Sequence, residues 1–251
     1  MYPSLEGKVA IITGAGSGIG QAGALRLAER GATVIVQDIS AKGAAETLGQ
    51  IEAAGGKGFS YLADVSDIAA IQGVVRAVEE RFGRIDILVN NAGTVNDFCP
   101  IEEVTPEMFE RSIAVHVRGT LFATQAAVPG MKKRRYGKIV NMSSIQGTVG
   151  NPNGATYNAA KGALLSMAKG WAKEFGPFNI MVNCVAPGPT ITPMVTTRLA
   201  PEYFTERAKQ IPLGRWGTAE DISYAISFLS GPESDFITGQ AVSPNGGVAI
   251  T

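Results

Sequence analysis

The sequence lacks a net charge and any long apolar run. Its 22 acidic and 22 basic side chains cancel formally, which argues against a nucleic-acid-binding protein or a polybasic membrane-associated protein. No run approaches about 18 apolar residues, so no transmembrane helix is predicted. The first residues show no charged start followed by a long apolar segment, so we expect no signal peptide.

Cysteine and histidine are also scarce. Cys99 and Cys184 are far apart in sequence and lack the spacing of metal ligands, and His116 is the only histidine. No metal site is therefore predicted. Free thiols in a reducing compartment are the simpler interpretation, although two cysteines alone leave a disulfide open. We expect a soluble cytoplasmic protein.

The one local excess of charge is the basic run from Lys132 to Arg135. It falls where a long helix is expected to end, and cations at that position complement the helix dipole. A solvated helix terminus is therefore favoured over a docking patch for an acidic partner.

Short β-branched apolar runs alternate with longer helix-compatible segments. Strands that are apolar on both faces and separated by helices predict a parallel sheet covered by helices on both sides. The expected strands are Val9–Thr13, Thr33–Gln37, Gly58–Leu62, Ile85–Asn90, Lys138–Met142, Ile180–Val185 and Gln240–Ser243. The expected helices are Ile19–Arg30, Ala41–Ala54, Ile68–Phe82, Pro106–Lys133, Ala155–Phe175 and Ala219–Ser230.

The chain shows no repeat, linker or composition shift. Its 251 residues are therefore predicted to form a single α/β domain, 1–251. The least regular stretch, 189–212, is a candidate substrate lid within that domain. Pro129-Gly130 should end or kink the longest helix.

A glycine-rich turn, from Thr13 to Gly20, joins the first strand to the first helix. Such a turn lets the backbone approach a pyrophosphate, whose charge the N-terminus of the helix favours. The predicted cofactor contacts in it are Gly14, Ser17, Gly18, Ile19 and Gly20. The spacing is not GxGxxG, and in a chain with 31 glycines a merely structural turn is an equal alternative for this motif alone.

Asp38 favours the cofactor interpretation. It follows the second expected strand, close to the roughly 20-residue offset of the acid that binds the adenosine ribose hydroxyls. A carboxylate there accepts hydrogen bonds from the diol and repels a 2′-phosphate, and no basic residue immediately follows it. We therefore predict NAD rather than NADP. The alternative is that Asp38 caps the next turn.

Ser144, Tyr157 and Lys161 carry the predicted chemistry. Tyr157 and Lys161 are four residues apart on an expected helix and so share a face. An adjacent ammonium stabilises the phenolate of a tyrosine, which otherwise is a poor base at neutral pH. Ser144 follows a strand and can hydrogen-bond a substrate oxygen as charge develops. The trio predicts acid–base catalysis of a redox reaction.

Over essentially its full length the chain resembles the short-chain dehydrogenase/reductase family. The motifs that carry the resemblance are the glycine turn, Asp64-Val65, Asn90-Asn91-Ala92-Gly93, Ser144, Tyr157-Asn158-Ala159-Ala160-Lys161, Pro187-Gly188, Pro212-Leu213-Gly214-Arg215 and Thr238-Gly239-Gln240. The resemblance implies seven parallel strands in the order 3-2-1-4-5-6-7, a doubly wound Rossmann-type fold, and NAD(P) across the carboxyl ends of the strands.

The family likeness also implies a role for each matching residue. Tyr157 would be the acid/base, Lys161 would bind the nicotinamide ribose and lower the tyrosine pKa, and Ser144 would orient the substrate. Further cofactor contacts would be Asp64 and Val65 at the adenine, Asn91, Ala92 and Gly93 alongside the cofactor, and Pro187, Gly188, Thr190 and Thr192 at the nicotinamide. Many members are homotetramers, assembled through the helices matching Pro106–Lys133 and Ala155–Phe175 and the last strand.

Two positions depart from the family pattern. His116 replaces an asparagine that supports a helix kink, where a backbone carbonyl holds a water of the proton relay to the lysine. His116 either fills that space or joins the relay through its imidazole, which would then titrate near neutral pH. The second departure, Ser243 to Gly247, is distant from the chemistry in sequence and receives no catalytic role.

The predicted substrate residues follow strand ends and are largely uncharged. They are Gln146, Thr148, Asn153 and Thr94-Val95-Asn96, beside Ser144 and Tyr157. They favour a neutral, moderately polar secondary alcohol or ketone such as a polyol, sugar or cyclic alcohol, although any of them can instead stabilise a loop. Two other functions stay open: a 3-oxoacyl carrier-protein reductase, and a cofactor-binding regulatory or structural protein without turnover.

Overall fold

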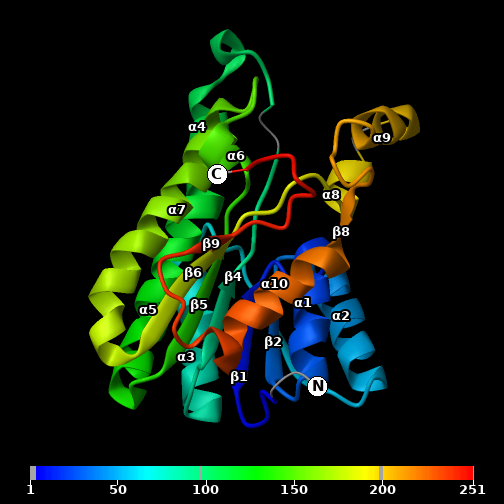
Figure 1. The fold of residues 1–251 in the computed structure, drawn as a ribbon. Helices are drawn as coiled ribbons and strands as arrows, with labels where there is room; N and C mark the ends of the chain where they lie inside the picture. The colour runs from blue at the N-terminus through cyan, green and yellow to red at the C-terminus, as the bar shows by residue number, and fades with distance from the viewer. Residues whose placement is uncertain (1–3, 96–97, 198–199, 251) are drawn as a thin grey trace.

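A computed structural model describes residues 4–95, 98–197 and 200–250 (Figure 1). Seven strands form one parallel sheet in the order β3-β2-β1-β4-β5-β6-β9. Their bounds are β1 Val9–Thr13, β2 Thr33–Asp38, β3 Lys57–Leu62, β4 Ile87–Asn90, β5 Gly137–Met142, β6 Ile180–Val185 and β9 Ala241–Val242. The predicted strand order is confirmed, with β9 as the seventh strand.

Helices cover both faces of this sheet. In β1, Ala10 and Ile12 belong to one buried cluster while Val9 and Ile11 belong to the other, as the two-residue period of a strand requires. The helices over the first cluster are α1 Gly18–Glu29, α2 Ala41–Ala53 and α10 Ala219–Ser230. Those over the second are α3 Ile68–Phe82, α5 Gly119–Arg134 and α7 Ala155–Phe175.

The longest predicted helix is interrupted in the structure. It consists of α4 Pro106–Ile113, a π-helical turn η2 Ala114–Arg118, and α5. The sequence predicts that Pro129-Gly130 ends or kinks this helix; the end is wrong, since α5 continues through Pro129. Buried Ala127, Val128 and Met131 anchor this part of α5 against the sheet, which outweighs the lost backbone hydrogen bond. The helix ends where Arg135 takes a left-handed conformation, at φ 53°.

The stretch 189–212 contains more regular structure than predicted. Strand β7, Thr190–Ile191, pairs in parallel with β8, Gly217–Thr218, and two short helices follow β7 in the chain, α8 Pro193–Thr196 and α9 Pro201–Ala208. Each helix has proline at its first position, where the missing N–H costs nothing. In Figure 1 this segment stands apart from the main sheet, beyond the carboxyl ends of the strands.

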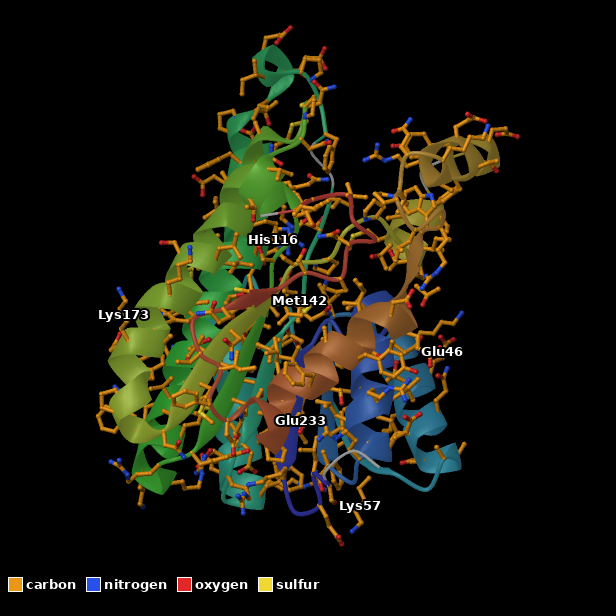
Figure 2. The ribbon with its side chains drawn as sticks, viewed as in Figure 1. Glu46, Lys57, His116, Met142, Lys173 and Glu233 are labelled. Carbon is orange, nitrogen blue, oxygen red and sulfur yellow. The ribbon has the colours of Figure 1, made fainter. Side chains whose placement is uncertain are left out.

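The remaining short elements lie at loops. They are η1 Ile101–Glu103, α6 Gln146–Val149, η3 Gly176–Phe178 and η4 Pro232–Ser234. Figure 2 shows Met142, the last residue of β5, near His116, whereas Lys57, the first residue of β3, lies at the other end of the sheet. None of the helices in the described ranges is long and apolar enough to span a membrane.

Candidate active site

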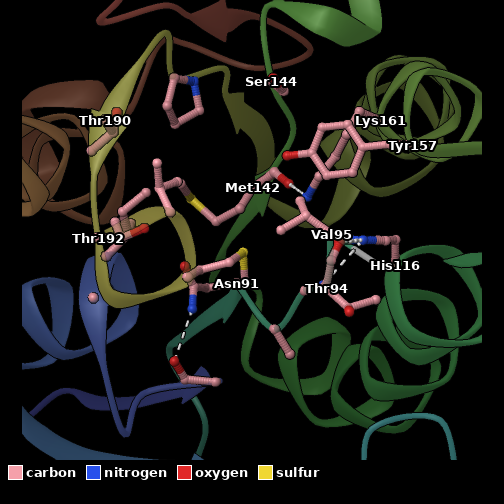
Figure 3. A pocket seen from close by; sticks show the side chains of 18 of the residues that line it. Asn91, Thr94, Val95, His116, Met142, Ser144, Tyr157, Lys161, Thr190 and Thr192 are labelled. Carbon is pink, nitrogen blue, oxygen red and sulfur yellow. Dashed lines mark hydrogen bonds between the residues drawn. The ribbon is translucent and has the colours of Figure 1, made fainter. Parts of the chain in front are cut away.

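A cavity of about 920 Å³ lies at the carboxyl ends of the strands. Loops after β1, β2, β4, β5 and β6 line it, and β7, α8, α9 and Trp216, just before β8, contribute residues from the other side. The volume is near the upper end of the range for ligand sites. The glycine turn borders this cavity together with Ser144, Tyr157 and Lys161, so the two predicted halves of the site are one space (Figure 3).

The glycine turn is shaped by close backbone contacts. Gly14 has φ +63°, which favours glycine, and a Cβ added to Gly20 would overlap the carbonyl oxygen of Gly14. Helix α1 begins at Gly18, and its first residues line the cavity. The Ser17 side chain makes no capping hydrogen bond, which leaves the first N–H groups of α1 to a ligand.

Asn91 fastens the segment after β4 to this turn. Its Nδ2 donates to the carbonyl oxygens of Thr13 at 2.9 Å and Gly14 at 3.1 Å. The Thr13 hydroxyl in turn accepts from the backbone N–H groups of Asn91 and Ala92, each at 3.0 Å. The side chain of Asn91 therefore shapes the cavity wall, and Asn91, Ala92 and Gly93 all line the cavity.

Asp38 faces the cavity at the end of β2. Its Oδ2 accepts from the backbone N–H of Gly16 at 2.7 Å, and its Oδ1 from that of Ser40 at 2.8 Å. The bond to Ser40 is the turn-capping contact predicted as the alternative to binding the adenosine ribose. Both roles are compatible, because each carboxylate oxygen has a further lone pair for a ribose hydroxyl.

Asp64 and Val65 lie at the same end of the cavity. Burial opposes ionisation of Asp64, but hydrogen bonds from Ser66 and the charge of Arg111 outweigh it and hold the pKa of Asp64 below its ordinary value. Arg111 approaches Asp64 Oδ2 at 3.4 Å and also lines the cavity. No motif in the sequence singles out Arg111.

Tyr157 and Lys161 come from the first turns of α7, and Ser144 from the loop after β5. Lys161 Nζ donates to the Met142 carbonyl oxygen at 2.7 Å and lies 5.4 Å from the centre of the Tyr157 ring. Burial lowers the pKa of Lys161 to about 7. Ser144 is buried, and its Oγ accepts from the N–H of Gln146 at 3.2 Å.

His116 lies on the π-helical turn and is only 1% exposed. Its Nε2 is 2.8 Å from the Thr94 carbonyl oxygen and 3.3 Å from the Thr94 backbone nitrogen, whose N–H points to it. The shorter contact, to an oxygen that can only accept, favours the tautomer with the proton on Nε2. The imidazole meets the Tyr157 ring edge to face, with centroids 5.5 Å apart. His116 thus connects the loop after β4 to the ring of Tyr157.

This environment argues against titration of His116 near neutral pH. Burial, and then the charge of Lys161, lower the pKa of His116 to about 3. The imidazole is therefore neutral in the folded protein. Its Nδ1 is buried and has no hydrogen-bond partner among the described residues.

The far wall is formed by the segment after β6. Pro187, Gly188, Thr190 and Thr192 all line the cavity. Thr192 lies close to the glycine turn: its Cβ and methyl carbon would each be 3.5 Å from a Cβ added to Gly18. The segment after β6 therefore packs against the start of α1.

The loop from Ser243 to Gly247 supports that wall. Gly188 donates its N–H to the Pro244 carbonyl at 3.1 Å, and a Cβ on Gly188 would lie 2.6 Å from Asn245 Cα. Although distant from the site in sequence, this loop packs directly behind it, because β9 is adjacent to β6 in the sheet.

Comparison with known proteins identifies the family. The profile of the family described as Enoyl-(Acyl carrier protein) reductase matches residues 14–249. The chain is 44% identical to the 3-oxoacyl-(acyl-carrier-protein) reductase FabG of Thermotoga maritima, over 98% of this chain and 99% of the relative. It belongs to the short-chain dehydrogenase/reductase family. This confirms the predicted family.

Two further members of the family are similar over almost the whole chain. An uncharacterised oxidoreductase of Methylorubrum extorquens is 42% identical, over 97% of this chain and 98% of the relative. The crystal structure of levodione reductase superposes with a TM-score of 0.93 at 31% identity, covering 96% of this chain and 97% of the other. The chain is therefore an oxidoreductase of a family that binds a nicotinamide cofactor, and its fold matches that of a solved member.

Some predicted residues are not at the cavity. Asn153 takes a left-handed conformation and its carbonyl accepts from the N–H of Cys99, so its contacts are those of a loop. Neither Asn153 nor Thr148 is among the residues that line the cavity, and Asn96 is outside the described residues. Gln146, Thr94 and Val95 do line it.

The basic run at the end of α5 is far from the site. Arg134 forms an ion pair with Glu79 and donates to the Ile85 carbonyl, which precedes β4. Lys132 lies 3.9 Å from Glu174. The run is therefore at the amino ends of the strands, opposite the cavity, and is partly neutralised there.

The sequence did not indicate the apolar part of the cavity. Its residues come from five separate segments: Phe98, Ile145 and Val149, Met194, Tyr203, and Trp216. No periodic pattern or motif connects them, because their proximity arises from tertiary packing of segments distant in sequence. This part of the cavity is consequently more apolar than the residues predicted for it from the sequence.

Proposed function

We propose that the protein is an NAD(H)-dependent oxidoreductase that interconverts a secondary alcohol and a ketone. The observation that carries this proposal is the Tyr157–Lys161 pair, which faces the same cavity as the glycine turn. The bound cofactor would supply or accept the hydride. In reduction Tyr157 would donate its phenolic proton to the substrate oxygen, and in oxidation it would remove that proton.

Ser144 and Lys161 would assist Tyr157 in different ways. The Ser144 hydroxyl would hydrogen-bond the substrate oxygen and stabilise charge that develops on it. A positive charge on Lys161 would favour the phenolate form of Tyr157. Lys161 is held in place by its bond to the Met142 carbonyl, so its position does not depend on the ligand.

The cavity wall fits a dinucleotide. The tight glycine turn and open N-terminus of α1 would hold the pyrophosphate, Asp38 the adenosine ribose, and Asp64 and Val65 the adenine. Lys161 and the segment from Pro187 to Thr192 would flank the nicotinamide. The Asp38 carboxylate favours NAD, because a 2′-phosphate would be repelled there.

His116 is proposed as a positioning residue in place of the family asparagine. Its Nε2–H to the Thr94 carbonyl and its edge-to-face contact would hold the Tyr157 ring and the loop after β4 together. A neutral imidazole with a pKa of about 3 supports this role over that of a titrating relay group.

For the substrate, we favour a 3-oxoacyl thioester. The 44% identity to a 3-oxoacyl-(acyl-carrier-protein) reductase and the apolar residues around the catalytic end support it. Docking of a carrier by Lys132–Arg135 is not part of the proposal, since that run is at the opposite end of the sheet. The cofactor expected here remains NADH.

A neutral cyclic or polyhydroxylated alcohol is the second candidate. Gln146 and Ser144 supply an amide and a hydroxyl at the catalytic end. The likeness to levodione reductase supports a ketone as the reacting group.

We further propose a cytoplasmic homotetramer with a small-molecule substrate and with neither a nucleic acid nor a membrane as partner. Cys99 and Cys184 are not joined by a disulfide, which supports the compartment, and exposed Leu121 and Phe236 support association. Within a single domain, the segment 189–212 is proposed as the substrate lid, since Met194 and Tyr203 line the cavity.

An absorbance assay at the NADH band tests the proposal. NADH and NADPH are each supplied with acetoacetyl thioesters and cyclic ketones, and NAD with polyols and sugars. We expect turnover with NADH on at least one class and a clear preference for thioesters. Binding of NADH without turnover on the whole panel would instead favour a cofactor-binding regulatory protein.

A further inference from the structure

Two charged residues in the described cavity wall have no proposed cofactor or catalytic role, Arg111 and Arg207, and of these Arg111 is paired with Asp64. The other charged residues lining the cavity are Asp38, Asp64 and Lys161. Asp38 faces the glycine turn, Asp64 and Arg111 approach each other at 3.4 Å, and Lys161 is buried beside Tyr157. Arg207 comes instead from α9, on the substrate side.

The geometry of α9 directs Arg207 into the cavity. Tyr203 and Arg207 are four residues apart, so they share one face of the helix, and both line the cavity. Trp216 lies beside this face, with its ring centre 6.2 Å from that of Tyr203 and its Nε1 donating to the Phe204 carbonyl at 3.0 Å. This side of the cavity thus presents an aromatic pair, Tyr203 and Trp216, together with the Arg207 guanidinium.

Arg207 has donor capacity to spare. Its Nη1 donates to Gln210 Oε1 at 2.5 Å, and no carboxylate within the described ranges forms an ion pair with it. The neighbouring cations are neutralised: Lys209 pairs with Glu206 at 2.7 Å and Arg215 with Asp221 at 2.6 Å. A guanidinium has five N–H donors in a planar arrangement that matches a carboxylate or phosphate.

We propose that Arg207 binds an anionic group of the substrate, a carboxylate or a phosphate, at the end of the molecule remote from the reacting carbon. This inference rests on the proposed function, because it concerns the substrate of the same site. On a thioester substrate the group would be the phosphate of a phosphopantetheine arm; on a small 3-oxo acid it would be the carboxylate. The aromatic face of Tyr203 and Trp216 would contact the intervening apolar part.

Matched ligand pairs test the proposal by calorimetry on the full chain saturated with NAD. The first pair is 4′-phosphopantetheine and pantetheine, which differ by a phosphate alone. The second is 3-hydroxybutanoate and its methyl ester, which differ by a carboxylate charge. We expect the anionic member of one pair to bind at least about tenfold more tightly than its neutral partner, as charge-assisted hydrogen bonds allow.

Arg207→Ala should remove that preference and leave NAD affinity unchanged. Lys209→Ala is the matched control, since Lys209 is exposed at the C-cap of the same helix, is paired with Glu206, and does not line the cavity. The control should retain the preference of the wild type. If the first pair shows the preference, Arg207 binds a phosphate; if the second pair shows it, Arg207 binds a carboxylate.

Wild-type protein that binds both members of each pair equally, or binds none, overturns the proposal, as does an unchanged preference in Arg207→Ala. Turnover assays with NADH and the corresponding acetoacetyl compounds, run in parallel, distinguish failure of the Arg207 inference from failure of the proposed function. An Arg207-dependent preference in binding without any turnover would contradict the proposed function alone. Turnover that is indifferent to Arg207 and to the anion would contradict this inference alone.

Discussion

At the scale of single residues, burial determines the chemistry of the site. Lys161 and His116 are both nearly inaccessible, and burial lowers the pKa of each, to about 7 and about 3. Lys161 therefore retains a titration within the physiological range, whereas His116 does not. Tyr157 lies against both groups, with its ring 5.4 Å from the Lys161 Nζ and 5.5 Å from the imidazole.

Replacing Tyr157 by phenylalanine removes the proton donor but keeps the ring contacts. We expect Tyr157→Phe to lower kcat by about 10²-fold or more, the usual contribution of a positioned acid or base, while NADH affinity is retained. Steady-state rates and NADH fluorescence titration measure the two quantities. A wild-type turnover number in this variant would eliminate Tyr157 as the acid/base.

His116→Asn should keep much of the activity. Asparagine is the residue of the family pattern at this position, and the pH profile should keep its shape because a group with a pKa of about 3 does not titrate in the assay range. Profiles of kcat/KM for wild type and variant check this. Loss of an ionisation between pH 6 and 8, roughly the range of ordinary imidazoles, would show that His116 titrates during catalysis.

Lys161 should make the stability of the ligand-free protein depend on pH. Its pKa is about 7 in the fold, because of burial, against an ordinary value of 10.5. Between these values the unfolded chain binds more protons, so the free energy of unfolding rises with pH. Lys161→Met should therefore flatten this rise. The variant should have the larger free energy of unfolding at pH 7, and the difference from wild type should shrink toward pH 10.

Urea unfolding at several pH values measures the difference. The control is Lys173→Met, an exposed lysine of the same helix that Figure 2 shows projecting from α7. If Lys161→Met and Lys173→Met change the pH dependence equally, then the buried Lys161 does not carry the depressed pKa assigned to it.

Single residues also show what the sequence can predict. Ser144, Tyr157 and Lys161 were identifiable because their spacing and the glycine turn form one motif set, and all three line the cavity. Arg111, Arg207 and Trp216 were not, because their approach to the cavity depends on packing between segments distant in sequence. The sequence singles out His116 as the only histidine, but its depressed pKa follows from burial that only the structure shows.

At the scale of elements, the glycine turn requires Gly20 to lie so close to the Gly14 carbonyl that no side chain fits between them. Gly20→Ala would place its Cβ against the Gly14 carbonyl and the Asn91 amide, so we expect loss of most NADH binding. Gly49→Ala is the matched control, because nothing lies within 4 Å of a Cβ there and alanine favours a helix by about 1 kcal/mol. Fluorescence titration with NADH compares them.

Undiminished NADH affinity in Gly20→Ala would show that this turn does not hold the cofactor. Gly49→Ala should instead bind NADH normally and unfold at an equal or higher urea concentration. Both changes add one methyl group within a helix. A difference in NADH affinity between the two variants is therefore due to the close approach of the Gly14 carbonyl to Gly20.

Elements with strong local patterns were predicted well. Strands β1 and β6 and helices α3 and α7 have the predicted bounds, since apolar runs and capping residues define them locally. The π-helical turn that splits the longest helix had no signal in the periodicity. Nor had β7 and β8, which are two residues long and owe their pairing to tertiary contact.

At the scale of the whole molecule, exposed apolar residues suggest self-association. Phe236 and Ile250 are almost fully exposed in the single chain, and Leu121 on α5 is partly so. We expect sedimentation to give one species of four times the 26.2 kDa chain mass. Phe236→Asp should shift this species toward dimers or monomers, and a wild-type protein that sediments as a monomer would contradict the proposed tetramer.

The overall fold was predictable because alternating strands and helices leave few topologies for a parallel sheet. Substrate identity was less accessible, because it depends on how the segment 189–212 packs over the strand ends. The choice between NAD and NADP is intermediate in how far the sequence predicts it. Asp38 is evident in the sequence, but only the structure shows that its bond to the glycine turn holds its carboxylate at the cavity.

The most direct test of the central claim is the ratio of kcat/KM for NADH to that for NADPH, measured with one reducible ketone or thioester. We expect wild type to prefer NADH by more than about tenfold, as expected when a 2′-phosphate meets a fixed carboxylate. Asp38→Ala should bring the ratio close to one. A wild-type preference for NADPH, or a ratio indifferent to Asp38, would contradict the account.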